Sequence, residues 1–294
     1  MSQPPPPLLR DIVQRALTED LSFGDITTSA LFPKMRAARA EIVAHQEMVA
    51  AGIAVAREVF LAVDPALKIH GSIRDGQSVG PSTTLLVAAG DGRSLLMAER
   101  VALNFLQRLS GIATLTRQFC LAVRGFPTKI LDTRKTTPGL RVLEKWAVRL
   151  GGGHNHRFTL SDGLLIKDNH LALLRTEGID LQNACRQARI AGPHGIKVIV
   201  ETQGLAEVKQ AINGKADVIL LDNMTPALVR KAVELIKGRA LVEVSGGITL
   251  ANAGDMARAG ADFLSIGALT HSAPAADLSM DVSATGKRIR SGRT

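Results

Sequence analysis

The sequence predicts an α/β barrel of the phosphate-binding type, preceded by an amino-terminal α+β sandwich. Between residues 128 and 267, six short apolar runs alternate with stretches of helical periodicity, an order that indicates parallel βα units. Each run ends in a polar or glycine-containing segment, whereas the earlier part of the chain mixes helices with alternating strands. We therefore predict two domains, at residues 1–112 and 113–271, with residues 272–294 packing back on the first.

In the first domain, apolar spacing predicts an amphipathic helix over residues 8–19. The segment SFGDITT is typical of a turn that carries helix-capping residues. A long helical pattern is expected to break near Ser110 and Gly111. The other elements follow from alternating or apolar runs, which predict strands at residues 36–45, 47–52, 67–73 and 79–89.

The second domain begins near Thr128. Its strands are expected to end at Asp132, Asp168, Glu201, Asp222, Gly247 and Gly267. Helices are expected at residues 139–150, 178–191, 204–213, 225–236 and 249–259. An open doubly wound sheet fits the same rhythm. The barrel is favoured because functional residue types follow every strand, and because the last two strands end in SGGI and SIGAL, as phosphate-binding corners of barrels do.

Composition excludes several classes of protein. No apolar stretch is long enough to cross a bilayer, and the start MSQPPPPLLRD lacks the pattern of a secretory signal. Two cysteines 65 positions apart fit free thiols in a reducing cytoplasm, where we expect the protein. The net charge of +9 is spread along the chain and aromatic residues are 3%, which argues against nucleic-acid binding and favours small anionic substrates.

The string LDTRKTTPGLR follows the first barrel strand. It places Arg134 and Lys135 side by side, with Thr133 before them, at the end of a strand. Two cations with nearby hydroxyls and backbone N–H groups suit a phosphate or a carboxylate. The alternative is a solvated basic loop.

Two further segments carry cations. GGGHNHRF combines three glycines, which let a backbone approach a ligand closely, with His156 and Arg157. Its histidines could instead face solvent, bind zinc or mark a metal-dependent nuclease, although no neighbouring carboxylate or cysteine completes such a site. LLIKDNH puts Lys167 at a strand end, either at the edge of the core or facing the barrel mouth, and Asp168 and Asn169 could cap the next helix.

Acidic residues and glycines end the remaining strands. Glu201 and Asp222 end consecutive strands and could perform acid–base work, hold Mg²⁺ together with substrate phosphates, or pair with the lysines. Two glycine-containing turns could offer backbone N–H groups to a phosphate, and they consist of Ser245, Gly246, Gly247 and of Ile266, Gly267, Ala268. The residues alone thus predict a barrel enzyme for a phosphorylated substrate and a second acidic molecule, with Mg²⁺.

The motifs resemble the quinolinate phosphoribosyltransferase family over nearly the whole chain. They include EDLSFGDITT, AERVALNFLQRLSGIAT, DTRKTTPGLRVLEKWAV, GGGHNHRFTLSDGLLIKDNH, VIVET, VILLDNM, EVSGGI and FLSIGALTHS, in that order. The resemblance implies transfer of the phosphoribosyl group of phosphoribosyl pyrophosphate to quinolinate with loss of CO₂, giving nicotinate mononucleotide in NAD biosynthesis. It also implies a homodimer with shared sites.

By the family's pattern, the carboxylates of quinolinate would be held by Arg134, His156, Arg157 and Lys167. Arg100, in the AERVALN motif, would reach in from the partner subunit. The residues serving phosphoribosyl pyrophosphate and its Mg²⁺ would be Lys135, Glu201 and Asp222, and the two glycine-containing turns would hold the 5′-phosphate.

The sequence departs from the family's pattern at two positions that we assign no chemistry. Ile199 stands where the strand often carries a second glutamate, and Thr159 replaces a common glycine. Two alternatives stay open: a phosphoribosyltransferase of the molybdenum-locus type, which shares the TRKT and GGG segments but lacks NHR and KDNH, and a barrel that binds phosphorylated metabolites without catalysis.

Overall fold

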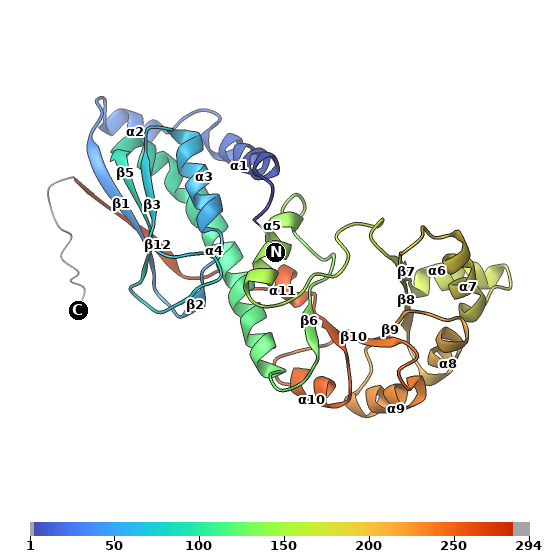
Figure 1. Ribbon diagram of the computed structural model, residues 1–294. Coiled ribbons are helices and arrows are strands. Elements are labelled where there is room, and N and C mark those ends of the chain that lie inside the picture. Colours follow the sequence, from blue (N-terminus) through green and yellow to red (C-terminus); the bar gives the residue numbers. More distant parts are fainter. Residues whose placement is uncertain (1–2, 285–294) are drawn as a thin grey trace. The chain divides into compact units, whose positions relative to one another are not determined.

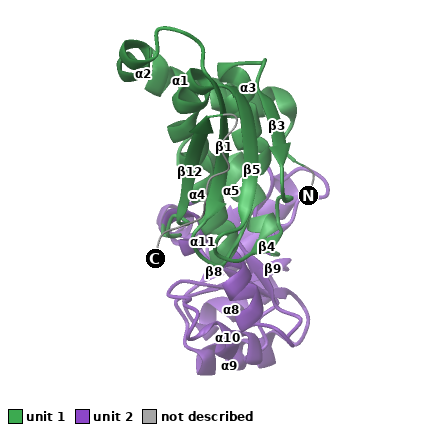
Figure 2. Ribbon diagram, turned by 90° about the vertical axis from the view of Figure 1, so that its left-hand side faces the viewer, with its two compact units in different colours: residues 1–115, 137–152, 272–294 green, residues 116–136, 153–271 purple. Residues whose placement is uncertain are grey.

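The computed structural model describes residues 3–284, which divide into two compact units. Of these residues, the first unit comprises 3–115, 137–152 and 272–284, and the second comprises 116–136 and 153–271 (Figure 2). We expected 137–152 within the barrel domain, whereas they group with the first unit. The buried Glu144 explains this grouping, because it accepts hydrogen bonds from the Arg108 side chain (2.8 Å) and the Thr137 N–H (3.0 Å).

The first unit contains an antiparallel sheet in the order β12-β1-β5-β3. These strands are β12 (Leu278–Ala284), β1 (Ala37–Ala44), β5 (Thr84–Asp91) and β3 (Lys68–Gly71), and a separate pair consists of β2 (Met48–Val49) and β4 (Ser78–Val79). Every second residue of β1 is buried, as expected for a strand with one face on the core. The segment 272–284 contributes β12 to this sheet, and the rest of the predicted carboxyl-terminal segment lies outside the described residues.

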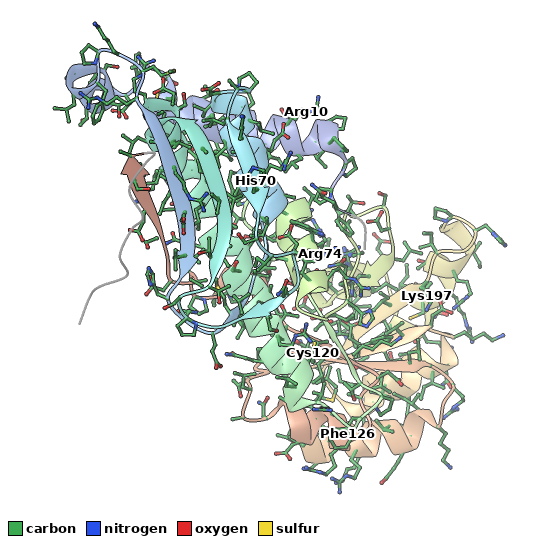
Figure 3. The ribbon with its side chains drawn as sticks, turned by 60° about the vertical axis from the view of Figure 1, so that its left-hand side comes forward. Arg10, His70, Arg74, Cys120, Phe126 and Lys197 are labelled. Atoms are coloured by element: carbon green, nitrogen blue, oxygen red, sulfur yellow. The ribbon has the colours of Figure 1, made fainter. Side chains whose placement is uncertain are left out.

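The helices of this unit are α1 (Pro6–Leu21), α2 (Ile26–Leu31), α3 (Ile53–Val63) and α5 (Arg141–Leu150). Helix α1 buries the predicted stripe at Leu9, Ile12, Val13 and Leu17. Arg10 of this helix, labelled in Figure 3, has its Nε 3.6 Å from Oε1 of Glu58 on α3. The SFGDITT turn works as predicted, since Asp25 caps α2 by accepting the Thr28 N–H.

Helix α4 (Gly92–Ala122) is continuous, so the predicted break near Ser110 and Gly111 is wrong. Both residues serve tertiary packing instead. Ser110 Oγ bonds the backbone N–H and C=O of Ala51 at 3.0 and 3.1 Å. A Cβ on Gly111 would lie 1.9 Å from the carbonyl oxygen of Pro274, so only glycine lets that backbone approach the helix.

The second unit is built on a parallel sheet in the order β6-β11-β10-β9-β8-β7. Figure 1 shows β6, β10, β9, β8 and β7 following one another along an arc, with α8, α9 and α10 on its outer side. The strands are β6 (Lys129–Leu131), β11 (Phe263–Ser265), β10 (Leu241–Ser245), β9 (Val218–Asp222), β8 (Val198–Thr202) and β7 (Leu164–Ile166). All six predicted strands are present, and the predicted α/β barrel with an amino-terminal α+β domain is confirmed.

The helices that alternate with these strands are α6 (Asp168–Thr176), α7 (Leu181–Ala191), α8 (Leu205–Asn213), α9 (Pro226–Ile236), α10 (Ala253–Arg258) and α11 (Ala268–His271). Asp168 is the first residue of α6 rather than its cap. Burial raises the pKa of the Cys185 thiol, on α7, to about 11. Among the residues of known placement, no helix is long and apolar enough to cross a membrane.

Candidate active site

A cavity of about 850 Å³ lies at the carboxyl ends of the parallel strands. Every predicted site residue except Arg100 lines it. These residues are Thr133, Arg134, Lys135, His156, Arg157, Lys167, Glu201, Asp222, Ser245, Gly246, Gly247, Ile266, Gly267 and Ala268. The strands bring these residues together because side chains that follow parallel strands meet at one end of a barrel.

The loop after β6 carries the two adjacent cations. The backbone N–H of Lys135 donates to Thr133 Oγ1 (3.1 Å), and Thr270 Oγ1 donates to the Lys135 carbonyl (2.8 Å). These bonds hold the loop backbone from two sides. Arg134 Nε is buried without a hydrogen-bond partner among the described residues. An unpaired buried donor is unfavourable, so this guanidinium is placed to gain from a bound anion.

Asp132, the residue after β6, anchors the glycine-rich loop. Its buried carboxylate accepts hydrogen bonds from Asn155 Nδ2 (2.6 Å) and from the backbone N–H of His156 (2.8 Å). The His156 side chain is only 10% exposed. The alternative in which it faces solvent is therefore wrong.

Arg157 lies in a site of excess positive charge. Its Nη1 donates to the Gly163 carbonyl (2.8 Å). Burial lowers the pKa of Arg157, and the positive charge of Arg134 lowers it further, against an opposing effect of Asp162. A negative ligand beside the two guanidinium groups would relieve this repulsion.

The acidic side of the cavity is formed by Glu201 and Asp222. Lys167 Nζ lies 3.5 Å from Glu201 Oε2, so the ion pairing considered for Glu201 is present, although half of the lysine side chain is exposed. Burial raises the pKa of Glu201, and the charges of Asp222 and Asp168 raise it further, while Lys167 lowers it. The two carboxylates thus lie close enough to influence each other.

Both glycine-containing turns depend on glycine for their shape. Gly246 and Gly247 have φ angles of 84° and 62°, and a Cβ on Gly246 would lie 2.2 Å from Asn223 Oδ1. A Cβ on Gly267 would lie 3.0 Å from Lys135 Cδ and 3.1 Å from the His271 ring. The second turn is therefore covered by two basic side chains.

Several cavity residues were not predicted, and they are Leu165, Leu220, Asn223, Glu243, Ile248, Thr249, Ser265 and His271. Glu243 is the most unusual of them, because it is a carboxylate with only 2% exposure in the middle of β10. Its Oε1 accepts a hydrogen bond from the Ser265 hydroxyl and lies 3.4 Å from His156 Nε2. The only signal in the sequence is one acidic residue between two valines, Val242 and Val244.

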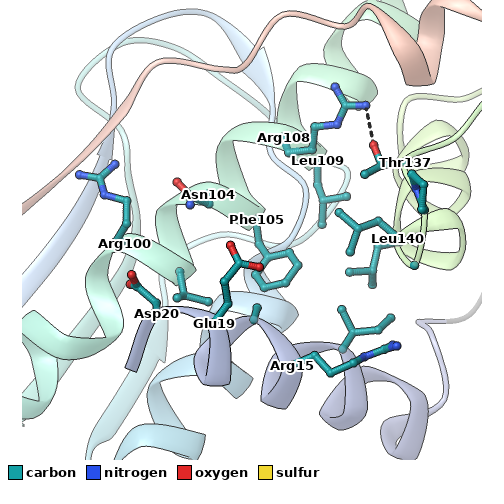
Figure 4. A pocket seen from close by; sticks show the side chains of 16 residues that line it. Arg15, Glu19, Asp20, Arg100, Asn104, Phe105, Arg108, Leu109, Thr137 and Leu140 are labelled. Carbon is teal, nitrogen blue, oxygen red and sulfur yellow. Dashed lines mark hydrogen bonds between the residues drawn. The ribbon is translucent and has the colours of Figure 1, made fainter. Parts of the chain in front are cut away.

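Arg100 lines a different cavity, of about 480 Å³, in the first unit. Figure 4 shows it on α4 together with Asn104, Phe105 and Arg108, with Phe105 directed toward α1 and the Arg100 guanidinium pointing away from that helix. Its side chain is 60% exposed, and its guanidinium is 3.9 Å from Glu99. The structure of one chain therefore leaves this guanidinium available on the surface.

The zinc and nuclease alternatives find no support. The backbone of His154 pairs with that of β6. The His154 N–H donates to the Ile130 carbonyl (2.7 Å), and the His154 carbonyl accepts the Asp132 N–H (3.2 Å). Between residues 3 and 284, no group of three histidine, cysteine or acidic side chains is placed to hold a metal ion.

Comparison with known proteins identifies the family. Residues 25–110 match the model for the N-terminal domain of quinolinate phosphoribosyl transferase, and residues 112–281 match that for its C-terminal domain. A Bacillus subtilis protein named probable nicotinate-nucleotide pyrophosphorylase (carboxylating) is 40% identical over 281 residues, covering 96% of both chains. A quinolinate phosphoribosyltransferase (decarboxylating) of Nicotiana glauca is 39% identical, covering 93% of this chain and 82% of its own length.

Solved structures support the same family assignment. The crystal structure of NadC from Streptococcus pyogenes superposes with a TM-score of 0.91 at 39% identity, covering 97% of this chain and 99% of that one. The nicotinate-nucleotide pyrophosphorylase of Francisella tularensis gives a TM-score of 0.89 at 37% identity, covering 96% and 98%. The chain therefore belongs to the quinolinate phosphoribosyl transferase family.

Proposed function

We propose that this protein catalyses phosphoribosyl transfer from phosphoribosyl pyrophosphate to quinolinate, a step of NAD biosynthesis. One molecule of each substrate gives nicotinate mononucleotide, pyrophosphate and CO₂. The observation that carries the proposal is the single cavity that collects the predicted cations, carboxylates and glycine-containing turns. A site of this composition suits a dianionic acid beside a polyphosphate.

Quinolinate would bind among Arg134, His156, Arg157 and Lys167. The buried, unpartnered Nε of Arg134 and the lowered pKa of Arg157 support this assignment. A carboxylate would accept a hydrogen bond from Arg134 Nε, and its negative charge would offset the repulsion between the two guanidinium groups. The pyridine ring would then be held with its nitrogen facing the ribose. Positioning of this kind lowers the barrier without a covalent enzyme intermediate.

Phosphoribosyl pyrophosphate would occupy the opposite side of the cavity. The backbone N–H groups of the turns at Gly246 and Gly267 would bind the 5′-phosphate. Lys135, whose side chain passes over Gly267, would neutralise the departing pyrophosphate. Thr133 supports this role by holding the Lys135 backbone.

Glu201 and Asp222 fit Mg²⁺ in the manner usual for phosphate enzymes, with one or two carboxylates completed by water and substrate phosphates. The donor set matches that manner, because Asp222 lies close enough to Glu201 to raise its pKa, and two carboxylates leave positions for water and substrate phosphates. When bound, the ion would neutralise charge on the pyrophosphate. The carboxylates themselves would also orient the ribose hydroxyls.

The chemistry needs no proton donor from the protein. The ring nitrogen donates its electron pair to the anomeric carbon as the bond to pyrophosphate breaks, through an oxocarbenium-like transition state. The nitrogen is then positively charged. It can stabilise the electron pair left when the adjacent carboxylate departs as CO₂, and that carbon takes up a proton from water.

We further propose a cytoplasmic homodimer in which Arg100 completes the site of the partner subunit. The exposure of the Arg100 side chain supports this arrangement. Two free cysteines fit a reducing compartment.

The proposal is tested by supplying the purified protein with quinolinate, phosphoribosyl pyrophosphate and Mg²⁺. Nicotinate mononucleotide and CO₂ should form in equal amounts. Binding of both substrates without turnover would instead indicate a protein that only binds phosphorylated metabolites.

The activity should fall at acidic pH at a point set by Glu201. Its proposed role needs the ionised carboxylate, and burial raises the pKa of that group above the ordinary value of a glutamate. Protonation therefore removes activity as the pH falls through this raised pKa. Asp168→Asn deletes a negative charge that also raises the pKa, so the acidic limb of kcat/KM should move to lower pH.

The limb can be measured between about pH 4 and pH 8 with both enzymes. Asp255→Asn is a matched control, because this carboxylate lies on α10, outside the residues that line the cavity. An acidic limb that stays in place in Asp168→Asn, as it should in the control, would contradict the assignment to Glu201.

A further inference from the structure

Glu243 lies where a carboxylate is costly. It is 2% exposed, and the neighbouring Val242 and Val244 are buried on the other face of β10. A buried carboxylate is retained only when donors surround it. Its Oε1 has two such groups in reach, the Ser265 hydroxyl and His156 Nε2. Because Glu243 and His156 both line the cavity, their contact lies at the cavity wall.

The hydrogen-bond partners of His156 assign its tautomer. Nδ1 accepts the backbone N–H of Arg157 at 2.8 Å, so this nitrogen carries a lone pair. The proton of the neutral ring is then on Nε2, the atom 3.4 Å from Glu243 Oε1. A contact of this length orients the ring but is too long for a strong hydrogen bond. A substrate oxygen at the cavity wall can share this proton with Glu243 in a three-centre hydrogen bond.

We propose that Glu243 is a positioning residue, which holds the His156 ring at the cavity wall so that the carboxylate of quinolinate can share the Nε2 proton. This inference rests on the proposed function. Ser265 fixes the Glu243 carboxylate, and Glu243 in turn fixes the ring plane of His156. Such a neighbour behind a ligand-binding histidine sets its orientation and tautomer.

The arrangement separates the two substrates in a testable way. Glu243 acts on the residue that would bind quinolinate, whereas the phosphate turns bind the other substrate. A change at Glu243 should therefore affect mainly the KM for quinolinate and leave the KM for phosphoribosyl pyrophosphate unchanged.

The variants compare loss of the acceptor oxygen with loss of the charge alone. Glu243→Leu removes the acceptor, and its KM for quinolinate should rise about tenfold to a hundredfold, the effect of losing one hydrogen bond that involves a charged group. Glu243→Gln keeps an acceptor oxygen, and its KM should stay within about threefold of the original protein. In a His156→Ala background, Glu243→Leu should have no further effect, because the two act as one unit.

A matched control comes from the opposite end of the same two strands. Asp262 precedes β11 and accepts the Val242 N–H at 2.7 Å, but it does not line the cavity. Asp262→Ala should lower thermal stability and leave the KM for quinolinate unchanged. If Glu243→Leu behaves like this control, Glu243 serves only packing and the inference is overturned.

Two other results would also overturn it. Equal loss of kcat in the Gln and Leu variants would mean that the charge of Glu243 acts directly on the reacting atoms. A full effect of Glu243→Leu in the His156→Ala background would mean that the two residues act separately.

An NMR measurement keeps this inference distinct from the proposed function. In ligand-free protein labelled with ¹⁵N-histidine, the His156 signals should show a proton on Nε2, and Glu243→Leu should broaden them as the ring gains freedom. A proton on Nδ1 would overturn the inference whatever the enzyme catalyses. Failure of the original protein to form nicotinate mononucleotide would instead overturn the proposed function alone.

Discussion

Nicotinate is expected to replace quinolinate poorly, with kcat/KM lower by at least about a hundredfold at saturating phosphoribosyl pyrophosphate. Nicotinate has one carboxylate where quinolinate has two, so one cation of the cavity would stay unpaired. Removing one partner of a buried ion pair costs at least about 3 kcal/mol, or roughly a hundredfold. The buried Arg134 Nε and the crowded Arg157 make the cavity sensitive to such a loss.

The measurement compares the two acids in steady-state kinetics. Thr159→Gly provides a control on the same loop, since Thr159 is exposed and does not line the cavity. The ratio of the two kcat/KM values should be the same in this variant. Equal use of nicotinate and quinolinate by the unaltered protein would contradict the prediction, because it would show that the cations of the cavity do not discriminate between one and two carboxylates.

Lys135→Ala is expected to lower kcat by about a hundredfold to a thousandfold, because one fixed donor to a developing negative charge is lost. Arg100→Ala should lower activity through the acceptor substrate instead, with a higher KM for quinolinate. Both variants should keep the fold, since Lys135 and Arg100 are exposed side chains. The two losses can be combined to test the shared site.

When the two variants are mixed and their subunits exchange, half of the dimers contain one chain of each kind. In such a dimer one site lacks both residues and the other is intact, so about a quarter of the original activity should return. Native mass spectrometry can verify the mixed dimers. Their presence without recovered activity would place Arg100 in the site of its own chain.

The fold could be predicted wherever periodicity decides it. Six parallel strands and the capped turn at Asp25 follow from local patterns. The continuity of α4 could not be predicted, because Gly111 serves a close approach by Pro274, a residue 163 positions away. The grouping of residues 137–152 depends likewise on the buried Glu144, whose partners a linear pattern cannot reveal.

The site was predictable where residues end strands, because parallel strands deliver those positions to one place. Several cavity residues that lie inside a strand or on a helix were not predicted. Glu243 lies inside a strand, and in the sequence it looks like one polar position in an alternating run. Because it is two residues before Ser245, however, it lies on the same strand face as that residue. His271 enters the cavity only because Gly267 lets its ring come close.

The pairing of β1 with β12 has a consequence for synthesis. These two strands come from residues 37–44 and 278–284, so the antiparallel sheet of the first unit is completed only after residues 278–284 have left the ribosome. The barrel strands emerge before that point. Until β12 arrives, β1 has an open edge, the kind of surface on which nascent chains pair wrongly, so a chaperone that shields β1 would be most useful late in translation.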